Sequence, residues 1–542
     1  MQKKGKLELT WVGKYDEKEI EPRILVEDKS KSYGDPDSEN MLIHGDNLIA
    51  LKALEQDYAG KIKCIYIDPP YNTGNAFEYY EDGLEHSEWL NLMRPRLEIL
   101  HSLLAEDGFF CCHIDDSEGP YLKCLCDEIF GRNNYLSTFY IQVRYPNKTL
   151  AEDSDYQKVI EQILIYAGDR YKAKVNRPVE EYSIDKFIWQ INELAEGEEI
   201  TLGNKKVIIF KPEQYSVEEI EPNLAGLKET WATGSLSRVK ASAGEFFELY
   251  LSDRKPVDGL GCLYKVYGIG EDGLGYRYIS GPKKESANKG KFYSGIPLNR
   301  LAELKEGKSF KRKPVTNFYD FAGGFGNCRL EGGVGFKGGK KPEALLEMIF
   351  NYFTEEGDLV LDSFLGSGTT VAVAHKMKRK YIGIERGEHA YSLCKVRLDN
   401  VVQGDKTGIS KAVNWQGGGG YKFYELAPSL LVPNPKLPTI KQINPEYTFE
   451  MMCEAICKLE GFKYKPDGKF HGKSSEQRFI HITKEFVNGE YINSLLANLG
   501  EEQSLLVYGM KIQSGLRLPD NIIVKKIPKD LLDKCTFESE VR

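Results

Sequence analysis

The chain has 542 residues, of which 41% are hydrophobic and 28% are charged, as is ordinary for a globular protein of roughly two to four domains. No run of about 18 uncharged apolar residues occurs, and the segment MQKKGKLELTWVG lacks the apolar core of a signal peptide. These features argue against a membrane protein and predict a cytoplasmic location. Eleven cysteines are thinly spread without the paired spacing of a zinc site, so we expect reduced thiols and no bound metal.

The basic residues are concentrated in one part of the chain. The net charge of -8 argues against a protein that coats nucleic acid along its length. Residues 228–313, however, contain 17 Lys and Arg against 10 Asp and Glu, interleaved with Tyr and Phe. Such a segment can follow the phosphates of a nucleic acid and reach its base edges. A solvated, β-rich domain accounts for the same composition equally well.

Strands and helices alternate on both sides of this basic middle. The N-terminal side predicts a strand end, turn and helix over 42–54, a strand over 61–68, a helix within 88–108 and a strand over 108–115. The C-terminal side predicts a helix over 341–354, a strand over 358–364, a helix over 369–380 and a strand over 381–385. Such alternation is typical of a parallel sheet, so we expect one α/β domain interrupted by a long insertion.

A glycine-rich turn joins the strand that ends at Asp362 to the next helix. Gly366 and Gly368 let the backbone approach a ligand at the helix N-terminus, and Glu385 ends the following strand, where it can reach a ribose diol. This spacing fits an adenosine-containing cofactor. It is not a dinucleotide fingerprint, because Val371 stands at the third glycine position, and no Lys follows the second glycine as in a P-loop. A tight strand-to-helix turn without a ligand is the alternative.

The stretch YIDPPYNTG at 66–74 places two prolines and an aromatic residue behind a buried strand that delivers Asp68. The prolines fix φ and remove N–H donors, so the loop presents carbonyl oxygens in a set direction. Together with DSFLGSG at 362–368, this stretch resembles the DNA amino-methyltransferases, which use S-adenosylmethionine and act on an exocyclic base nitrogen. Over about residues 5–430 the chain resembles the modification subunits of type III restriction-modification systems, through HGDNL, MRPRL, HIDDSE, DEIFG, VGFKGGKKPE and GGGGYKFYEL.

The resemblance implies a Rossmann-like, S-adenosylmethionine-dependent methyltransferase fold in the circular order of the β-class, with the catalytic loop before the cofactor loop. The expected regions are an N-terminal extension (1–40), the catalytic half (41–170), an inserted target-recognition domain (171–330), the cofactor-binding half (331–430) and a small α/β C-terminal domain (431–542).

The resemblance also implies a reaction, the methylation of N6 of an adenine flipped out of double-stranded DNA. Asp68 and the carbonyl of Pro69 would accept hydrogen bonds from the amino group, Pro70 would stiffen the loop, and Tyr71 would stack on the base. Cofactor contacts are implied for Asp46, Phe336, Lys340, Pro342, Asp362, Phe364, Gly366, Gly368, Thr369 and Glu385. Candidate DNA contacts in the insertion are Lys240, Arg254, Lys255, Arg277, Lys283, Lys284 and Lys289.

The implied partners are DNA, a second copy of the chain and a helicase-nuclease restriction subunit. Two other functions stay open, namely methylation of cytosine N4, against which the Asp of DPPY argues, and DNA recognition without catalysis, against which the intact motifs argue. A nicotinamide dehydrogenase is disfavoured by the missing third glycine. We expect structural roles for His113 and, as a turn and helix cap, for Asp115, Asp116 and Glu118.

Overall fold

The computed structural model describes residues 8–16, 20–72, 84–148, 155–232, 243–306, 309–336 and 339–535. The chain divides into two compact units, one of Met1–Asn176 with Thr316–Arg542 and one of Arg177–Val315. The inserted unit is thus shorter at both ends than the expected 171–330. It ends earlier because β18 (Phe318–Asp320) pairs with β6 (Tyr135–Gln142) in the sheet of the first unit.

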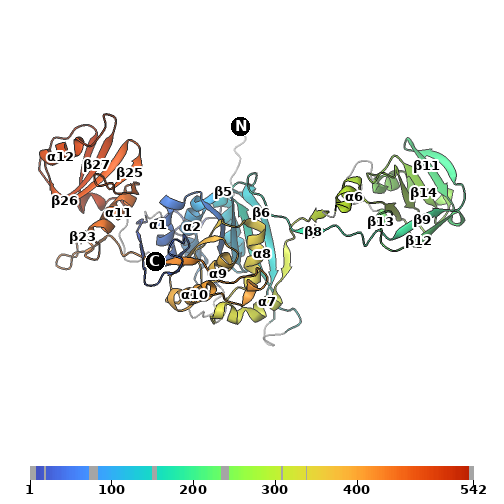
Figure 1. Ribbon diagram of the computed structural model, residues 1–542, viewed down its shortest axis with the longest axis horizontal. Coiled ribbons are helices and arrows are strands. Elements are labelled where there is room, and N and C mark those ends of the chain that lie inside the picture. The colour runs from blue at the N-terminus through green and yellow to red at the C-terminus, as the bar shows by residue number, and fades with distance from the viewer. Residues whose placement is uncertain are drawn as a thin grey trace. The chain divides into compact units, whose positions relative to one another are not determined.

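Within the described residues, eleven strands form the central sheet of the first unit (Figure 1). Its order is β1 (Leu25–Glu27), β21 (Gly420–Leu426), β3 (Met41–His44), β20 (Lys380–Glu385), β19 (Leu359–Asp362), β4 (Ile62–Ile67), β5 (Leu104–Ile114), β7 (Ile160–Ala167), β6 and β18, with β2 (Tyr33–Gly34) paired to β21. The α/β class is confirmed. The sheet has the expected parallel centre but is mixed, because β7 runs antiparallel to β5 and β6, and β1 runs antiparallel to β21. The described residues between β6 and β7 contain no crossover helix, so the chain returns antiparallel.

Helices cover both faces of this sheet (Figure 1). They are α1 (Asn47–Tyr58), α2 (His86–Leu103), α3 (Gly119–Cys126), α7 (Ala322–Asn327), α8 (Glu343–Phe353), α9 (Thr369–Lys376) and α10 (Val396–Val402). Successive residues of a strand point to opposite faces. Accordingly, Phe110 of β5 joins the core with Leu51 of α1 and Leu97 of α2. Its neighbour Phe109 faces the other way, with its ring 4.5 Å from that of Phe353 in α8.

Two segments far apart in sequence meet at the centre of the sheet. β19 pairs in parallel with β4, with Val360 opposite Cys64 and Leu361 opposite Ile65. On its other side β19 pairs in parallel with β20. Because parallel strands end at the same edge of a sheet, Asp68 after β4 and Asp362 at the end of β19 lie at one edge.

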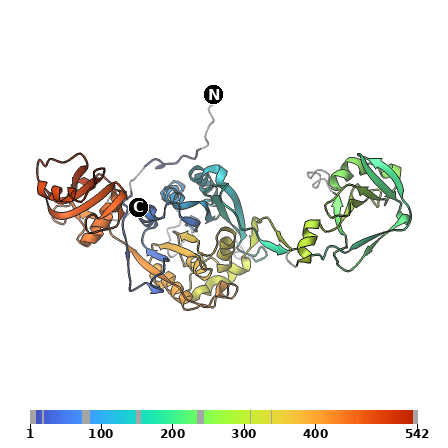
Figure 2. The same ribbon diagram turned by 45° about the horizontal axis from the view of Figure 1, so that its top comes forward.

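The inserted unit is built mainly of antiparallel strands, coloured green in Figure 2. Its elements are β8 (Val179–Glu181), β9 (Trp189–Glu193), β10 (Glu198–Leu202), β11 (Lys205–Phe210), β12 (Tyr215–Glu219), β13 (Lys228–Ala232), α4 (Ala243–Phe246), α5 (Lys255–Asp258), β14 (Leu263–Tyr267), β15 (Tyr276–Ser280), β16 (Gly290–Ser294), α6 (Leu298–Lys305) and β17 (Phe310–Arg312). The order of its main sheet is β10-β11-β14-β15-β16-β13. One face buries Ile209 and Tyr264 against Phe246 of α4, and the other buries Phe210 and Leu263.

In its described residues, the C-terminal region has a five-stranded sheet (β24-β25-β26-β27-β28), a two-stranded sheet (β22-β23) and two α-helices. It contains β22 (Leu431–Pro433), β23 (Lys441–Ile443), α11 (Phe449–Leu459), β24 (Lys463–Tyr464), β25 (Gly472–Ser475), β26 (Arg478–Val487), α12 (Gly489–Leu496), β27 (Ser504–Ile512) and β28 (Ile522–Lys526). The α/β content expected here is present, for example in α11 and β27. Its core also takes in Ile24 and Ala427, which belong to the segments that precede it. Among the described helices, none is long and apolar enough to cross a bilayer.

Candidate active site

Asp68 stands at the point where β4 ends, at the edge of the sheet. Its side chain is 21% exposed, but its Oδ1 atom is buried and receives no hydrogen bond from any described residue. Lys341 Nζ lies 3.4 Å from this oxygen, a charge contact without hydrogen-bond alignment. Asp68 therefore presents an acceptor oxygen with free capacity next to a cation.

The loop after Asp68 is held by side chains of its surroundings. The indole Nε1–H of the buried Trp89 donates to the carbonyl of Pro70 over 2.9 Å. Asn72 takes a left-handed conformation with φ of 59° and donates to Glu118 Oε1 over 2.5 Å and to the carbonyl of Leu84 over 2.8 Å. Glu118, which we expected only in a turn and cap, thus binds the exit of the catalytic loop.

Tyr71 is fixed by a charged pair that sequence reasoning did not select. Its hydroxyl donates to Glu161 Oε2 over 3.0 Å and accepts from Lys341 Nζ over 2.5 Å. Lys341 Nζ also lies 3.0 Å from Glu161 Oε2 and 4.7 Å from the centroid of the Tyr71 ring. The orientation of this ring is therefore set by Glu161 of β7 and by Lys341, just before α8.

The charged side chains around Asp68 and Tyr71 offset the cost of burying one another. Burial opposes ionisation of Glu161, yet Lys341 and His113 hold its pKa well below the usual range. Burial also opposes the charge on Lys341, but Asp68 and Glu161 outweigh it and raise the pKa of this lysine. Burial, together with the charge of Lys341, lowers the pKa of His113, whose Nδ1 lies 2.8 Å from the hydroxyl of Tyr66. At neutral pH the group consequently contains an ammonium ion and a neutral imidazole.

The glycine-rich turn at the end of β19 is tied to the next strand. Gly366 has φ of 57°, and its N–H donates to Glu385 Oε2 over 2.8 Å. Gly368 caps α9 in a left-handed conformation with φ of 78°, where a Cβ would lie 3.3 Å from the Cα of Cys394. Both positions require glycine. The second oxygen of Glu385 accepts from the N–H of Gly387 over 2.9 Å.

Asp362 organises the start of this turn. Its Oδ1 accepts from the N–H of Phe364 over 2.9 Å, and its Oδ2 accepts from the Thr370 hydroxyl over 2.6 Å. Burial raises the pKa of Asp362 to about 7, although these two hydrogen bonds oppose the shift. The hydroxyl oxygen of Ser363 is buried and has no hydrogen-bond partner among the described residues. A buried polar atom without a partner is a natural contact for a ligand.

The other residues expected at the cofactor fall into two groups. Asp46 caps α1 by accepting from the N–H of Leu48 over 2.9 Å, and it lines, with Pro70 and Glu385, a cavity of about 1910 Å³. Lys340 instead donates to carbonyls of its own segment, those of Arg329, Glu331 and Val334. Burial lowers the pKa of Lys340 to about 8.

The other two residues expected at the cofactor, Phe336 and Pro342, lie on either side of Lys340 in the sequence. Pro342 caps α8, and the ring centroid of Phe336 lies 6.1 Å from that of His389. The cofactor contacts of these residues stay predictions.

Comparison with known proteins places this site in a family. The sequence model described as DNA methylase matches residues 62–396, which is more than half of the chain. The chain belongs to this DNA methylase family. The "Probable type III restriction-modification enzyme HindVI Mod subunit" of Haemophilus influenzae is 35% identical over 440 residues, covering 75% of this methylase and 56% of the relative. The type III EcoPI Mod subunit of Escherichia phage P1 is 28% identical over 456 residues, covering 71% and 65%.

This methylase therefore spans between about half and two thirds of the length of these relatives. Among solved structures, the cytosine-N4-specific PvuII DNA methyltransferase matches with a TM-score of 0.33 and 14% identity, covering 70% of this chain and 91% of that one.

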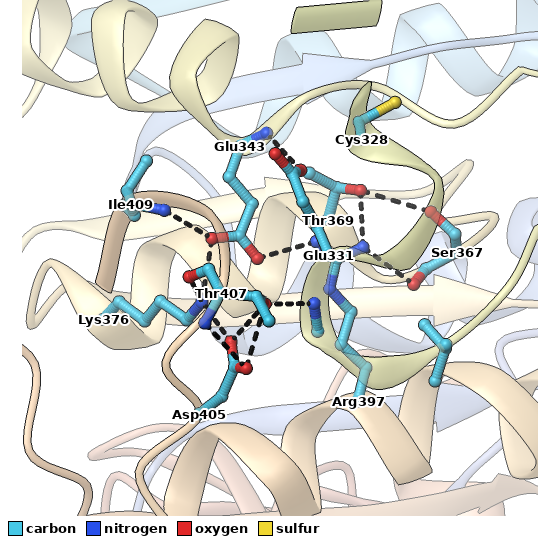
Figure 3. Close-up of polar contacts among 12 residues, drawn as sticks. Cys328, Glu331, Glu343, Ser367, Thr369, Lys376, Arg397, Asp405, Thr407 and Ile409 are labelled. Atoms are coloured by element: carbon cyan, nitrogen blue, oxygen red, sulfur yellow. Dashed lines mark hydrogen bonds and ion pairs between the residues drawn. The ribbon is translucent and has the colours of Figure 1, made fainter. Parts of the chain in front are cut away.

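Behind the cofactor loop the methylase contains a buried ionic group, the Glu343 cluster, formed by Glu343, Lys376, Arg397 and Asp405 (Figure 3). Glu343 accepts from Arg397 and from Lys376, each over 2.8 Å, and Lys376 also donates to Asp405 over 2.6 Å. Two cations thus face two carboxylates. Burial opposes the charge of Glu343, but the two cations lower its pKa.

Arg397 connects this cluster to the cofactor loop. Its second terminal nitrogen donates to the Thr369 hydroxyl over 2.7 Å and to the carbonyl of Ser367 over 3.3 Å. The Thr369 hydroxyl in turn donates to the carbonyl of Lys341 over 3.3 Å. A chain of hydrogen bonds therefore runs from the Glu343 cluster through the first turn of α9 to the segment that carries Lys341.

The candidate DNA contacts of the inserted unit differ in exposure. Arg254 and Lys255 pair with Asp258 and Glu285, and Arg277 is buried in an ion pair with Asp272. The exposed candidates lie between β15 and β16 and are Lys283, Lys284 and Lys289. Lys240 lies outside the described residues. Contact of these residues with DNA stays a prediction. The three exposed lysines are the candidates that a bound DNA can reach.

Lys341 and Glu161 are the residues of the site that sequence reasoning missed. Lys341 is adjacent to Lys340, which the sequence analysis proposed as a cofactor contact. Only the fold shows that the Lys341 side chain points to Tyr71 while that of Lys340 points to its own segment. Glu161 carried a signal, because it is an acidic residue near the start of the apolar strand IEQILIYA. In the part of the chain that the structure describes, no group of three or more His, Cys, Asp or Glu is placed to hold a metal ion.

Proposed function

We propose that the chain transfers a methyl group from S-adenosylmethionine to N6 of an adenine flipped out of a double-stranded DNA recognition sequence. The observation that carries this proposal is the buried Oδ1 of Asp68, which receives no hydrogen bond from the described residues and lies at the sheet edge next to the glycine-rich turn. An amino group that must be oriented for attack needs such an acceptor. Membership of the DNA methylase family supports the same conclusion.

The turn after β19 fits the cofactor. Gly366 and Gly368 leave room for close backbone approach, and the hydroxyl of Ser363, which has no hydrogen-bond partner in the described part of the chain, offers a hydrogen bond. Glu385 Oε2 accepts from the N–H of Gly366, and Oε1 accepts from the N–H of Gly387 and lies 3.0 Å from His389 Nε2. These contacts fix the carboxylate at the end of β20, where the ribose hydroxyls of the cofactor would lie. When bound, S-adenosylmethionine supplies a methyl group on a positively charged sulfur.

The catalytic loop supplies orientation. The N6 lone pair of adenine is delocalised into the ring and is a poor nucleophile. Asp68 and the carbonyl of Pro69 accept from the two N–H groups and direct the lone pair toward the methyl carbon. The lone pair forms the N–C bond as the C–S bond breaks with its electron pair on sulfur, and N6 then releases one proton.

Tyr71 offsets part of the cost of base flipping. Extruding a base from the duplex costs a few kcal/mol. Stacking on an aromatic ring returns about 1 to 3 kcal/mol per base. Because Glu161 and Lys341 hold the hydroxyl of Tyr71, its ring is ordered before the base arrives.

The partners follow from the relatives. Several curated relatives are Mod subunits of type III restriction-modification enzymes, which supports a role as a modification subunit beside a restriction subunit. We propose a homodimer acting on DNA in the cytoplasm, with the exposed lysines of the inserted unit on the phosphates.

The test is long-read sequencing of plasmid DNA after incubation with the protein and S-adenosylmethionine, with Asp68→Ala as the control. N6-methyladenine at one short recurring sequence, absent from the control, is the expected result. Detection of N4-methylcytosine would show that the target base is cytosine and not adenine. DNA binding without any modification would show that the protein recognises DNA without methylating it.

A further inference from the structure

We infer that Lys341 is a positioning residue for methyl transfer, whose ammonium group lies between the carboxylates of Asp68 and Glu161 and holds Asp68 oriented toward the amino group. This inference rests on the proposed function, since it assigns a task to a residue of the same site. It goes further because Lys341 acts through Asp68. Asp68 accepts the hydrogen bond from the base, and Lys341 contacts Asp68.

The geometry places one cation between two carboxylates. Lys341 Nζ is 3.4 Å from Asp68 Oδ1 and 3.0 Å from Glu161 Oε2, and the lysine side chain is only 7% exposed. Glu161 is 20% exposed. Two carboxylates that share a partly buried site cannot both stay ionised without a cation.

Lys341 is the cation that forms an ion pair with Asp68 among the described residues. Electrostatic interactions reach Asp68 from Tyr66, Tyr71, Cys112, His113, Lys341 and Asp362, and Glu161 acts on the same lysine and histidine. Burial and the charge of Lys341 keep His113 neutral. Lys341 is therefore the group that balances the carboxylates.

The backbone of Lys341 is fixed independently of its side chain. Its carbonyl accepts from the Thr369 hydroxyl in the first turn of α9, and the next residue, Pro342, caps α8. Its neighbour Lys340 points away and binds carbonyls of its own segment. The ammonium group is thus held at the catalytic loop by a segment that also contacts the cofactor turn.

Removing this charge has a definite consequence. In Lys341→Met, Asp68 and Glu161 lose the cation between them, and the group, which also includes His113 at 2.9 Å from Glu161 Oε2, binds a proton at a higher pH than in the wild type. Because an opposite charge within about 4 to 6 Å shifts a carboxyl titration by about 1 to 3 pH units, we expect the acid limb of kcat to move up by about that much. At a given pH on this acid limb, kcat is then about 10- to 1000-fold lower than in the wild type.

The matched variants separate charge from packing. Lys341→Met/Glu161→Gln has a single carboxylate again and should return the acid limb toward that of the wild type, with at least a tenfold gain in kcat over Lys341→Met. Lys341→Arg keeps the charge and should keep the wild-type acid limb. Glu161→Gln alone should move that limb to lower pH, a readout that does not depend on the folding of Lys341→Met.

The experiment measures kcat and KM of these full-length proteins on plasmid DNA from about pH 6 to pH 9, with S-adenosylmethionine binding by calorimetry as a check of folding. The expected pattern is a raised acid limb in Lys341→Met alone, with KM for the cofactor nearly unchanged. A wild-type acid limb in Lys341→Met, or no gain in the double variant, overturns the inference. A wild-type protein that methylates no adenine overturns the proposed function instead.

Discussion

Arg397→Met tests whether the Glu343 cluster stabilises the methylase. Arg397 and Glu343 are both fully buried, and the guanidinium donates to Glu343, Thr369 and Ser367 (Figure 3). Without Arg397, Lys376 alone faces the carboxylates of Glu343 and Asp405, and Thr369 and Ser367 each lack a hydrogen-bond donor. Removing one partner of a buried ion pair costs about 3 to 5 kcal/mol. We expect a decrease of this size in the free energy of unfolding.

Urea denaturation followed by circular dichroism measures the effect. With a slope of about 1 to 3 kcal/mol per molar urea, the decrease lowers the midpoint by at least about 1 M. The matched control is Lys395→Met on the segment leading into α10, which removes the ion pair with Asp399 at the surface and should cost less than about 1 kcal/mol.

The double variant Arg397→Met/Glu343→Gln restores the balance of charge and should be more stable than Arg397→Met. Equal midpoints for Arg397→Met and the Lys395→Met control would refute the assigned role of the cluster.

Three further outcomes follow from single groups of the structure. Burial raises the pKa of Asp362 from 3.8 to about 7, so the folded state retains a proton that the unfolded state releases. Stability should fall as pH rises across this window, and denaturation midpoints of Asp362→Asn should depend less on pH there. Trp89→Phe leaves a catalytic-loop carbonyl without its donor, which should cost about 1 to 3 kcal/mol and lower kcat more than cofactor affinity, as calorimetry and turnover rates would show. Alanine at Lys283, Lys284 and Lys289 should reduce the salt dependence of DNA binding, the slope of log K against log salt falling by about 0.9 for each phosphate that is no longer neutralised, and an unchanged slope would remove these lysines from the interface.

Much of the local structure was readable from the chain. The apolar run before Asp68 and the one before Asp362 are β4 and β19 in the structure, and the helices expected beside them are present. Local patterns suffice here, because burial of an apolar strand and the conformational needs of glycine act within a few residues. The motifs also indicated the family that the comparison shows.

The tertiary structure decided which residues share the site. Pairing of β19 with β4 brings together two loops that the whole insertion separates in sequence. Glu161 and Lys341 meet 180 positions apart, and the choice between Lys340 and Lys341 depends on which side of one extended segment faces the catalytic loop. Burial, ion pairing and the direction of a side chain arise from neighbours that are distant in sequence. For that reason the sequence by itself determined the two strand-to-loop segments and predicted their chemistry, and only the fold determined the charges around Asp68.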